Sequence, residues 1–197
     1  SSLNTPYIVN LCQTKTGKVI KNLGTAEDPG KDYAMCEIEL GEVPSADGAY
    51  NNAYRLIKPL GFDPAKKYPL IVYVYVGPHS SMVRDSCRAQ LRIWEMYMAQ
   101  RGYLVYVQDN RGTQNHGEAY EKAIWQQCGV AEMEDQIEGL KRLIDRGFVD
   151  SSRIGVHGWS YGGFMTLSLR LTKPYSDYFK VAVAGGPVID WKWYEVM

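Results

Sequence analysis

The stretch that decides the fold is Ile154-Gly155-Val156-His157-Gly158-Trp159-Ser160-Tyr161-Gly162-Gly163-Phe164. Its first four residues predict a short buried strand, and the residues from Phe164 to Leu171 predict a helix. Between them lies the pattern Gly-x-Ser-x-Gly, centred on Ser160. A strand, a sharp turn and a helix in this order present a serine hydroxyl at the edge of a sheet.

The glycines around Ser160 have a physical reason, because bulky neighbours do not fit a turn this tight. Backbone N–H groups at the start of the helix, and the positive end of its dipole, would lie near a developing oxyanion. We therefore interpret Ser160 as a nucleophile. The alternative is a glycine-rich turn from strand to helix with an incidental serine.

Outward from this motif, apolar runs alternate with helical periodicity. Further buried strands are predicted at 70–76, 104–107 and 181–184, and helices at 89–101 and 130–146. This alternation predicts an α/β fold, a mostly parallel sheet with flanking helices and right-handed crossovers. With Gly-x-Ser-x-Gly in its place, the prediction is the α/β-hydrolase fold over residues 51–197.

Residues 1–50 have a different pattern. Alternating residues at 7–11 and 18–20, with a turn at Thr16-Gly17, predict one β-hairpin. Residues 24–32 contain Pro29-Gly30 and predict a loop or linker, and residues 37–40 predict another short strand. We predict a boundary between two units near residue 50.

Composition excludes several classes of function. Lys and Arg total 22, as do Asp and Glu, so no net charge favours nucleic acid or an anionic membrane as partner. We expect no membrane segment, since no apolar run approaches the roughly 20 residues that cross a bilayer. The cysteines, Cys12, Cys36, Cys87 and Cys128, are widely spaced, so we expect no metal site, no cofactor and mostly buried free thiols.

An oxyanion hole needs two donors. The backbone N–H of Tyr161, directly after Ser160, is one. Tyr75, at the end of a predicted strand and just before Gly77-Pro78, is a candidate for the second, although a tyrosine at the end of a strand is more often a packing residue.

The general base is missing from its usual place. The histidines are His79, His116 and His157, and all three precede Ser160, whereas the order in α/β-hydrolases is serine, acid, histidine. Asp177 and Asp190 follow the serine, but each comes too soon for the end of a further strand. We therefore expect the sequence to be a fragment that stops before the triad Asp and His.

The chain resembles the prolyl oligopeptidase family of serine peptidases, and within it the dipeptidyl peptidase IV branch. The resemblance covers roughly residues 50–197. It is carried by Lys67-Tyr68-Pro69-Leu70, Val74-Tyr75-Val76-Gly77-Pro78-His79, Asp109-Asn110-Arg111-Gly112, Glu134-Asp135-Gln136-Ile137-Glu138, Gly147-Phe148-Val149-Asp150, Arg153-Ile154-Gly155, Gly158-Trp159-Ser160-Tyr161-Gly162-Gly163, and Pro187-Val188 with Trp191.

The resemblance implies site residues. Tyr75 becomes the side-chain oxyanion donor, and the aromatic pocket for a proline ring maps to Tyr161, Val188, Trp191 and Tyr194, with the role of Trp193 open. Ordinary core packing is the alternative for this cluster. Val76 departs from the pattern, because relatives usually carry glycine there, and a valine would tighten the turn beside Tyr75.

The resemblance also implies organisation and activity. Residues 1–50 would be the end of a β-propeller and its linker, and the substrate a peptide. We expect the parent protein to release N-terminal dipeptides after Pro or Ala through an acyl-enzyme on Ser160, and the fragment itself to be inactive. The alternatives are a tripeptidyl or acylaminoacyl peptidase, or a non-catalytic binding homologue. We also expect self-association through an exposed sheet edge, and the resemblance suggests a periplasmic or secreted protein.

Overall fold

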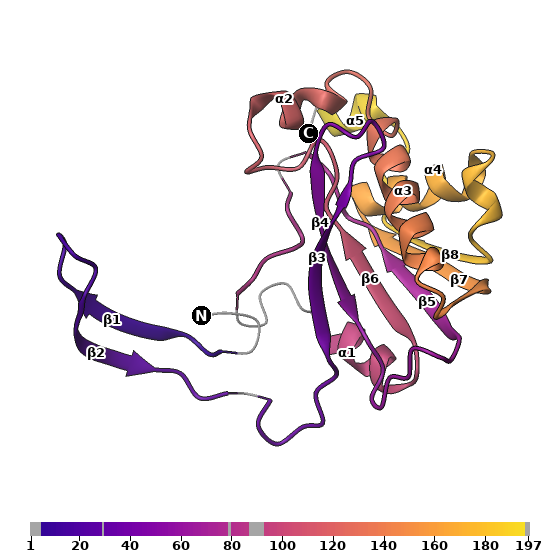
Figure 1. The fold of residues 1–197 in the computed structure, drawn as a ribbon. Helices are drawn as coiled ribbons and strands as arrows, with labels where there is room; N and C mark the ends of the chain where they lie inside the picture. Colours follow the sequence, from indigo (N-terminus) through magenta and orange to yellow (C-terminus); the bar gives the residue numbers. More distant parts are fainter. Residues whose placement is uncertain (1–4, 29, 79, 87–92, 196–197) are drawn as a thin grey trace.

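The computed structural model describes residues 5–28, 30–78, 80–86 and 93–195, and Figure 1 shows its elements. The strands are β1 Ile8–Cys12, β2 Val19–Thr25, β3 Ile38–Pro44, β4 Asn51–Ile57, β5 Tyr68–Tyr73, β6 Leu104–Gln108, β7 Val149–Trp159 and β8 Val181–Gly185. The α-helices are α1 Ile93–Gln100, α2 Glu118–Glu121, α3 Ala131–Asp145, α4 Tyr161–Leu171 and α5 Trp191–Glu195, with 3₁₀ turns at Lys122–Ile124 and Tyr175–Asp177.

Six strands form the central sheet, in the order β3-β4-β6-β5-β7-β8. The strands β6, β5, β7 and β8 run parallel, and β4 and β3 complete one edge in antiparallel pairing. The predicted α/β-hydrolase fold is confirmed in this parallel half with its helices. The sheet also includes β3, which lies before the boundary predicted near residue 50, because all seven of its residues pair with β4.

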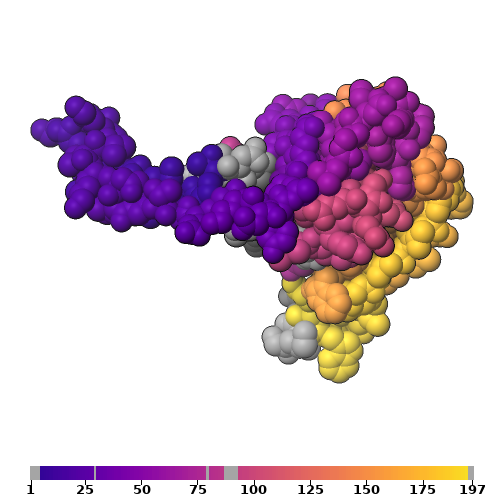
Figure 2. Space-filling model, turned by 90° about the horizontal axis from the view of Figure 1, so that it is seen from below, coloured from indigo at the N-terminus to yellow at the C-terminus, as the bar shows by residue number. Residues whose placement is uncertain are grey.

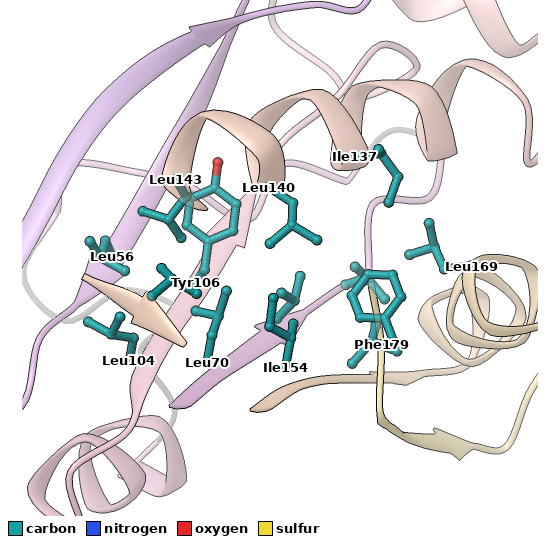
Figure 3. Close-up of a cluster of buried hydrophobic side chains, with 14 of the residues drawn as sticks. Leu56, Leu70, Leu104, Tyr106, Ile137, Leu140, Leu143, Ile154, Leu169 and Phe179 are labelled. Carbon is teal, nitrogen blue, oxygen red and sulfur yellow. The ribbon is translucent and has the colours of Figure 1, made fainter. Parts of the chain in front are cut away.

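Helices cover the two faces of the sheet unequally. Figure 1 shows α3 and α4 along one face and α1 against the other. The main core lies under α3 and α4, where the side chains of Figure 3 meet between helix and sheet. Leu56 and Tyr106 point into this core, whereas their neighbours Ile57 and Val105 pack with Met96 of α1, as the alternation of a strand requires.

The β1–β2 hairpin stands apart from the sheet. Both strands are exposed along their whole length, and Figure 2 shows the hairpin as an arm that projects from the α/β body. Apolar side chains on the arm, among them Val9 and Ile20, are more than half exposed. A two-stranded hairpin is marginal by itself in water, so further strands beside it would stabilise it.

Two glycines bring the motif around Ser160 against the end of β5. A Cβ atom at Gly158 would lie 2.3 Å from the carbonyl oxygen of Val74, and a Cβ at Gly162 would lie 2.1 Å from the same oxygen. Real Cβ atoms do not approach a backbone oxygen so closely. The turn from β7 into α4 is therefore seated on the backbone of β5, and only glycine permits that contact.

We predict that Gly162→Ala destabilises the fold by about 3 kcal/mol or more, because neither the Val74 carbonyl nor the helix can move away freely. The loss should appear in urea unfolding, despite the higher helix propensity of alanine. Gly155→Ala is the matched control, since a Cβ there would meet its nearest atom, the Val181 oxygen, at an ordinary 3.7 Å. Equal stability of the two variants would contradict the prediction.

Candidate active site

Ser160 lies at the bend between β7 and α4. Its backbone has φ 58° and ψ −117°, a conformation that residues other than glycine rarely adopt. The bend is fixed from β8, because the Ser160 N–H donates to the Gly185 carbonyl at 2.9 Å. The hydroxyl makes no capping hydrogen bond to α4. The strained backbone therefore presents a half-buried side chain at the rim of the sheet instead of using it to cap the helix.

Tyr75 lies two residues after the end of the neighbouring strand, β5. The strand β5 ends at Tyr73, three residues earlier than the run 70–76 predicts, and Tyr73 pairs with His157 of β7. A Cβ at Gly162 would lie 2.9 Å from the Cα of Tyr75, so the Tyr75 backbone adjoins the first turn of α4. Its half-buried ring packs against a cluster of Tyr73, Met82 and Val107.

Val76 has a left-handed backbone with φ 37°, and its side chain is fully buried in the main core. β-Branched residues rarely adopt this conformation, whereas glycine does so without cost. The departure from the family pattern therefore has a structural consequence, since core packing holds Val76 in a strained turn between Tyr75 and Gly77.

A buried carboxylate holds the loop that follows Tyr75. Asp109 accepts hydrogen bonds from the Ser81 hydroxyl at 2.7 Å, from the Met82 N–H at 2.7 Å and from the Val83 N–H at 3.3 Å. Burial raises the pKa of Asp109, and these three hydrogen bonds oppose the rise. Asp109 is among the residues that carry the family resemblance, but the sequence assigned it no role. Its position directly after a buried strand was the one indication that it belongs to the site.

A second buried group supports the same loop from β4. The Arg55 guanidinium donates to the Met82 carbonyl at 3.3 Å and pairs with Glu95 of α1 at 2.8 Å, and both charged side chains are fully buried. Breaking such a pair leaves an uncompensated charge in the interior, which is strongly destabilising. The loop after Tyr75 is thus fastened to β4, β6 and α1 together.

Aromatic rings gather beside Ser160. The ring of Tyr161 lies edge-on to Phe164 and Trp191, with centroids 5.4 and 5.8 Å away, and Trp191 contacts Tyr194 at 5.5 Å. Tyr161, Trp191 and Tyr194 line a cavity of about 860 Å³ together with Pro78 and Cys128 among others. The structure therefore brings together three of the four residues predicted for the pocket.

The other two residues considered for the pocket, Val188 and Trp193, lie outside the lining of the cavity. Val188 is absent from the lining of this cavity and is joined to the bend through its backbone N–H, 3.4 Å from the Ser160 carbonyl oxygen. Trp193 is exposed, with Lys192 over its ring.

The Tyr161 hydroxyl is the polar end of this wall. It donates to Glu132 of α3 at 2.5 Å, in the interior. Burial and the Glu132 carboxylate raise the pKa of Tyr161 well above its ordinary value, so the phenol keeps its proton. Sequence reasoning missed Glu132, and its position in the first turn of an amphipathic helix gave no signal of this contact.

The histidines have structural surroundings where the structure describes them. The His157 ring lies 3.1 Å from the Val183 carbonyl oxygen through Nδ1 and packs between Tyr73 and Trp94. The His116 ring stacks on Tyr120 at 4.5 Å. His79 and Cys87 lie outside the described residues, and Cys12, Cys36 and Cys128 are free thiols.

The described part of the chain has no cluster of metal-ligating side chains and no helix able to cross a membrane. There, three or more His, Cys, Asp or Glu side chains nowhere gather in a way that would hold a metal ion. None of the described helices has the length and apolar character needed to span a bilayer.

Comparison with known proteins identifies the family and the relatives that this chain is similar to. The family model described as "Prolyl oligopeptidase family" matches residues 89–197. Human dipeptidyl peptidase 8 is 35% identical over 98% of this chain, and mouse prolyl endopeptidase FAP is 38% identical over 90%. The chain spans about a fifth of the length of these curated relatives, 21% and 22%.

Solved structures agree with the sequence matches. A candidate dipeptidyl aminopeptidase IV from Bacteroides ovatus superimposes with a TM-score of 0.88 at 50% identity, over 93% of this chain and 26% of its own. Porphyromonas gingivalis dipeptidyl peptidase 4 superimposes with a TM-score of 0.83 at 34% identity, over 98% of this chain and 27% of its own.

The Asp109 contacts generate a prediction for the loop beside Tyr75. Asp109→Asn replaces an acceptor oxygen by an NH₂ group that faces backbone donors, so the loop should open more readily, by about 2 kcal/mol. Hydrogen exchange of the Met82 amide measures this opening. Asp150→Asn is the control, because Asp150 holds an exposed turn through Ser152 and Arg153. If the Met82 amide exchanges as slowly in Asp109→Asn as in the native chain, Asp109 does not anchor this loop.

Proposed function

The chain belongs to the prolyl oligopeptidase family, and from this premise we propose that it carries the nucleophile, Ser160, of a serine peptidase. The observation that supports the proposal most is the backbone of Ser160, which holds a left-handed φ directly before α4. A serine in such a bend is exposed to substrate on one side and adjoins unsatisfied helix N–H groups on the other.

In the proposed reaction, the Ser160 oxygen attacks the carbonyl carbon of a peptide bond and gives its proton to a general base. The tetrahedral oxyanion accepts hydrogen bonds from the Tyr161 N–H, which has no partner within α4, and from the Tyr75 phenol. The carbon–nitrogen bond then breaks, the base protonates the departing amine, and an ester of Ser160 remains. Water hydrolyses this ester by the same steps and frees the serine.

The proposed substrate is a peptide with proline or alanine as the residue before the cleaved bond. The cavity lined by Tyr161, the residue after Ser160, has an aromatic wall that Trp191 and Tyr194 complete. Such a wall suits a pyrrolidine ring, which has no polar group to pair. Val188 lies outside the lining of this cavity, and we propose that it contacts the substrate beside Ser160, to whose carbonyl its N–H donates. Because the named relatives include dipeptidyl peptidases, we propose release of N-terminal dipeptides.

Two further assignments belong to the whole protein. We propose that the triad Asp and His are supplied by residues other than those of this sequence, since the described His116 and His157 are engaged with Tyr120 and Val183. We also propose that the β1–β2 hairpin is part of a β-propeller, which would provide the neighbouring strands that its exposed apolar residues need.

Substitution in the whole protein tests the two leading roles. With a Gly-Pro chromogenic amide, Ser160→Ala should abolish turnover, and Tyr75→Phe should lower kcat about 10²- to 10³-fold with little change in KM, because a donor to the oxyanion is lost. Tyr103→Phe is the matched control, since Tyr103 lines a cavity on the other face of the sheet. Turnover that survives Ser160→Ala would exclude this nucleophile and favour another site, whereas a native protein without turnover would favour a non-catalytic binding homologue.

Three substrates separate the alternatives. A dipeptidyl peptidase cleaves Gly-Pro amide with a free amine and rejects the acetylated form, an acylaminoacyl peptidase accepts a blocked amine, and a tripeptidyl peptidase requires one more residue.

The 197-residue chain by itself provides a test of the general base. We expect it to hydrolyse no Gly-Pro amide, because no histidine follows Ser160 in the sequence and an unassisted serine hydroxyl is a weak nucleophile. The measurement is amide release by the folded chain, with folding checked by circular dichroism. Turnover that disappears in Ser160→Ala would show that one of its three histidines acts as the base.

A further inference from the structure

We propose that Glu132 is a positioning residue that fixes the ring of Tyr161 in the wall of the aromatic cavity, and thereby sets the size of ring that the cavity accepts. This inference rests on the proposed function of that cavity as the pocket for proline. It adds a residue from a different element, the first turn of α3, to a wall otherwise formed by the bend and by α5.

The contacts of Glu132 occupy both carboxylate oxygens. Oε1 accepts the Tyr161 hydroxyl at 2.5 Å, and Oε2 accepts the Gly129 N–H at 2.9 Å. The side chain is completely buried. Within the described part of the chain, no Lys, Arg or His forms a salt bridge with it. The carboxylate is therefore held by one phenol and by backbone amides around the start of α3, with that of Gly129 among them.

Burying a carboxylate without a neighbouring cation costs free energy of folding, so the presence of Glu132 at this position requires an explanation. Removing a charge from water costs several kcal/mol unless close hydrogen bonds replace the lost hydration. Burial raises the pKa of Glu132, and the hydrogen bonds from Tyr161 and Gly129 oppose that rise. An apolar residue at this position would pack without the cost but would leave the Tyr161 hydroxyl unpaired in the interior.

The ring of Tyr161 is restrained at both ends. At its base, a Cβ on Gly77 would lie 2.9 Å from Cγ of Tyr161, so the loop after Tyr75 closes on the ring. Along its edges lie Phe164 and Trp191. At its far end, Glu132 fixes the hydroxyl. Only 3% of Tyr161 is exposed, so the ring cannot move without displacing the groups packed around it.

The same contact ties the cavity to the reacting serine. Tyr161 follows Ser160, and its N–H is the proposed backbone donor to the oxyanion. Glu132 holds the Tyr161 ring in place. The pocket wall that this ring forms and the oxyanion donor, the Tyr161 N–H, therefore keep fixed positions relative to each other. A cavity of fixed depth discriminates against one additional methylene by about 10-fold or more, whereas a wall that can move accommodates it.

The experiment compares two small amides on the 197-residue chain, N-acetylpyrrolidine and N-acetylpiperidine, by ligand-observed NMR titration. We expect the native chain to prefer the pyrrolidine about 10-fold. Glu132→Gln keeps the size of the side chain but sets an NH₂ group against one of its two donors, and it should reduce the preference to about 2-fold. Tyr161→Phe should do the same, and the double variant should add nothing further.

Glu134→Gln is the matched control, because Glu134 lies on the same helix but faces Arg111 at 3.4 Å. Its preference should stay at the native value. A preference that survives unchanged in a folded Glu132→Gln chain would overturn the inference while leaving the pocket itself in place.

A second measurement requires no ligand. In a chain with ¹³C-labelled tyrosine rings, the Tyr161 resonances, assigned through Tyr161→Phe, should show slow ring flips that become fast in Glu132→Gln. Unchanged flipping would also overturn the inference. If neither amide binds the native chain, the proposed proline pocket fails, and the inference about ring size fails with it, whereas the flip rates still report whether Glu132 restrains the ring.

Discussion

The structure depends on one backbone contact, the approach of the Val74 carbonyl to the turn between β7 and α4. Because Gly158 and Gly162 have no Cβ, the end of β5 and the first turn of α4 come closer than any side chain would permit. That approach places Tyr75 beside α4 and leaves Ser160 to take the strained conformation between them. The Ser160 N–H is then held by the end of β8. The site is therefore a junction of three parallel strands and one helix.

Two buried acids stabilise two different segments at this junction. Asp109 gathers the backbone amides of the loop after Tyr75, and Glu132 holds the Tyr161 hydroxyl and the Gly129 amide. In both cases burial raises the pKa of the carboxyl group, so hydrogen bonds must offset the cost of removing the charge from water. Such groups specify one arrangement of a loop or ring more sharply than apolar packing does, because few other arrangements satisfy both oxygens.

The sequence predicted the parallel half of the sheet and the strand–turn–helix at Ser160, since buried strands and glycines leave local patterns. It did not reveal that β3 joins the sheet, because an alternating edge strand has the same pattern wherever it pairs. It also predicted too long a strand at 70–76. The chain turns after Tyr73, and the left-handed Val76 is held there by core contacts that no local pattern encodes. Met82 lies 27 residues from Asp109 and Tyr161 lies 29 residues from Glu132, and local sequence motifs do not reveal contacts over such separations. The assignment of roles to Ser160, Tyr75 and the aromatic residues rests on resemblance and geometry together.

The distance in sequence between Val74 and the two glycines has a consequence for biosynthesis. The bend at Ser160 is completed only after β5 and β7 have paired across the intervening α1, β6, α2 and α3, a non-local step that is slow relative to the formation of helices. Until then Ser160 is an ordinary alcohol in a flexible segment. The proposed reactivity would thus arise at the end of folding, and a nascent or misfolded chain would carry no active nucleophile with which to damage its neighbours.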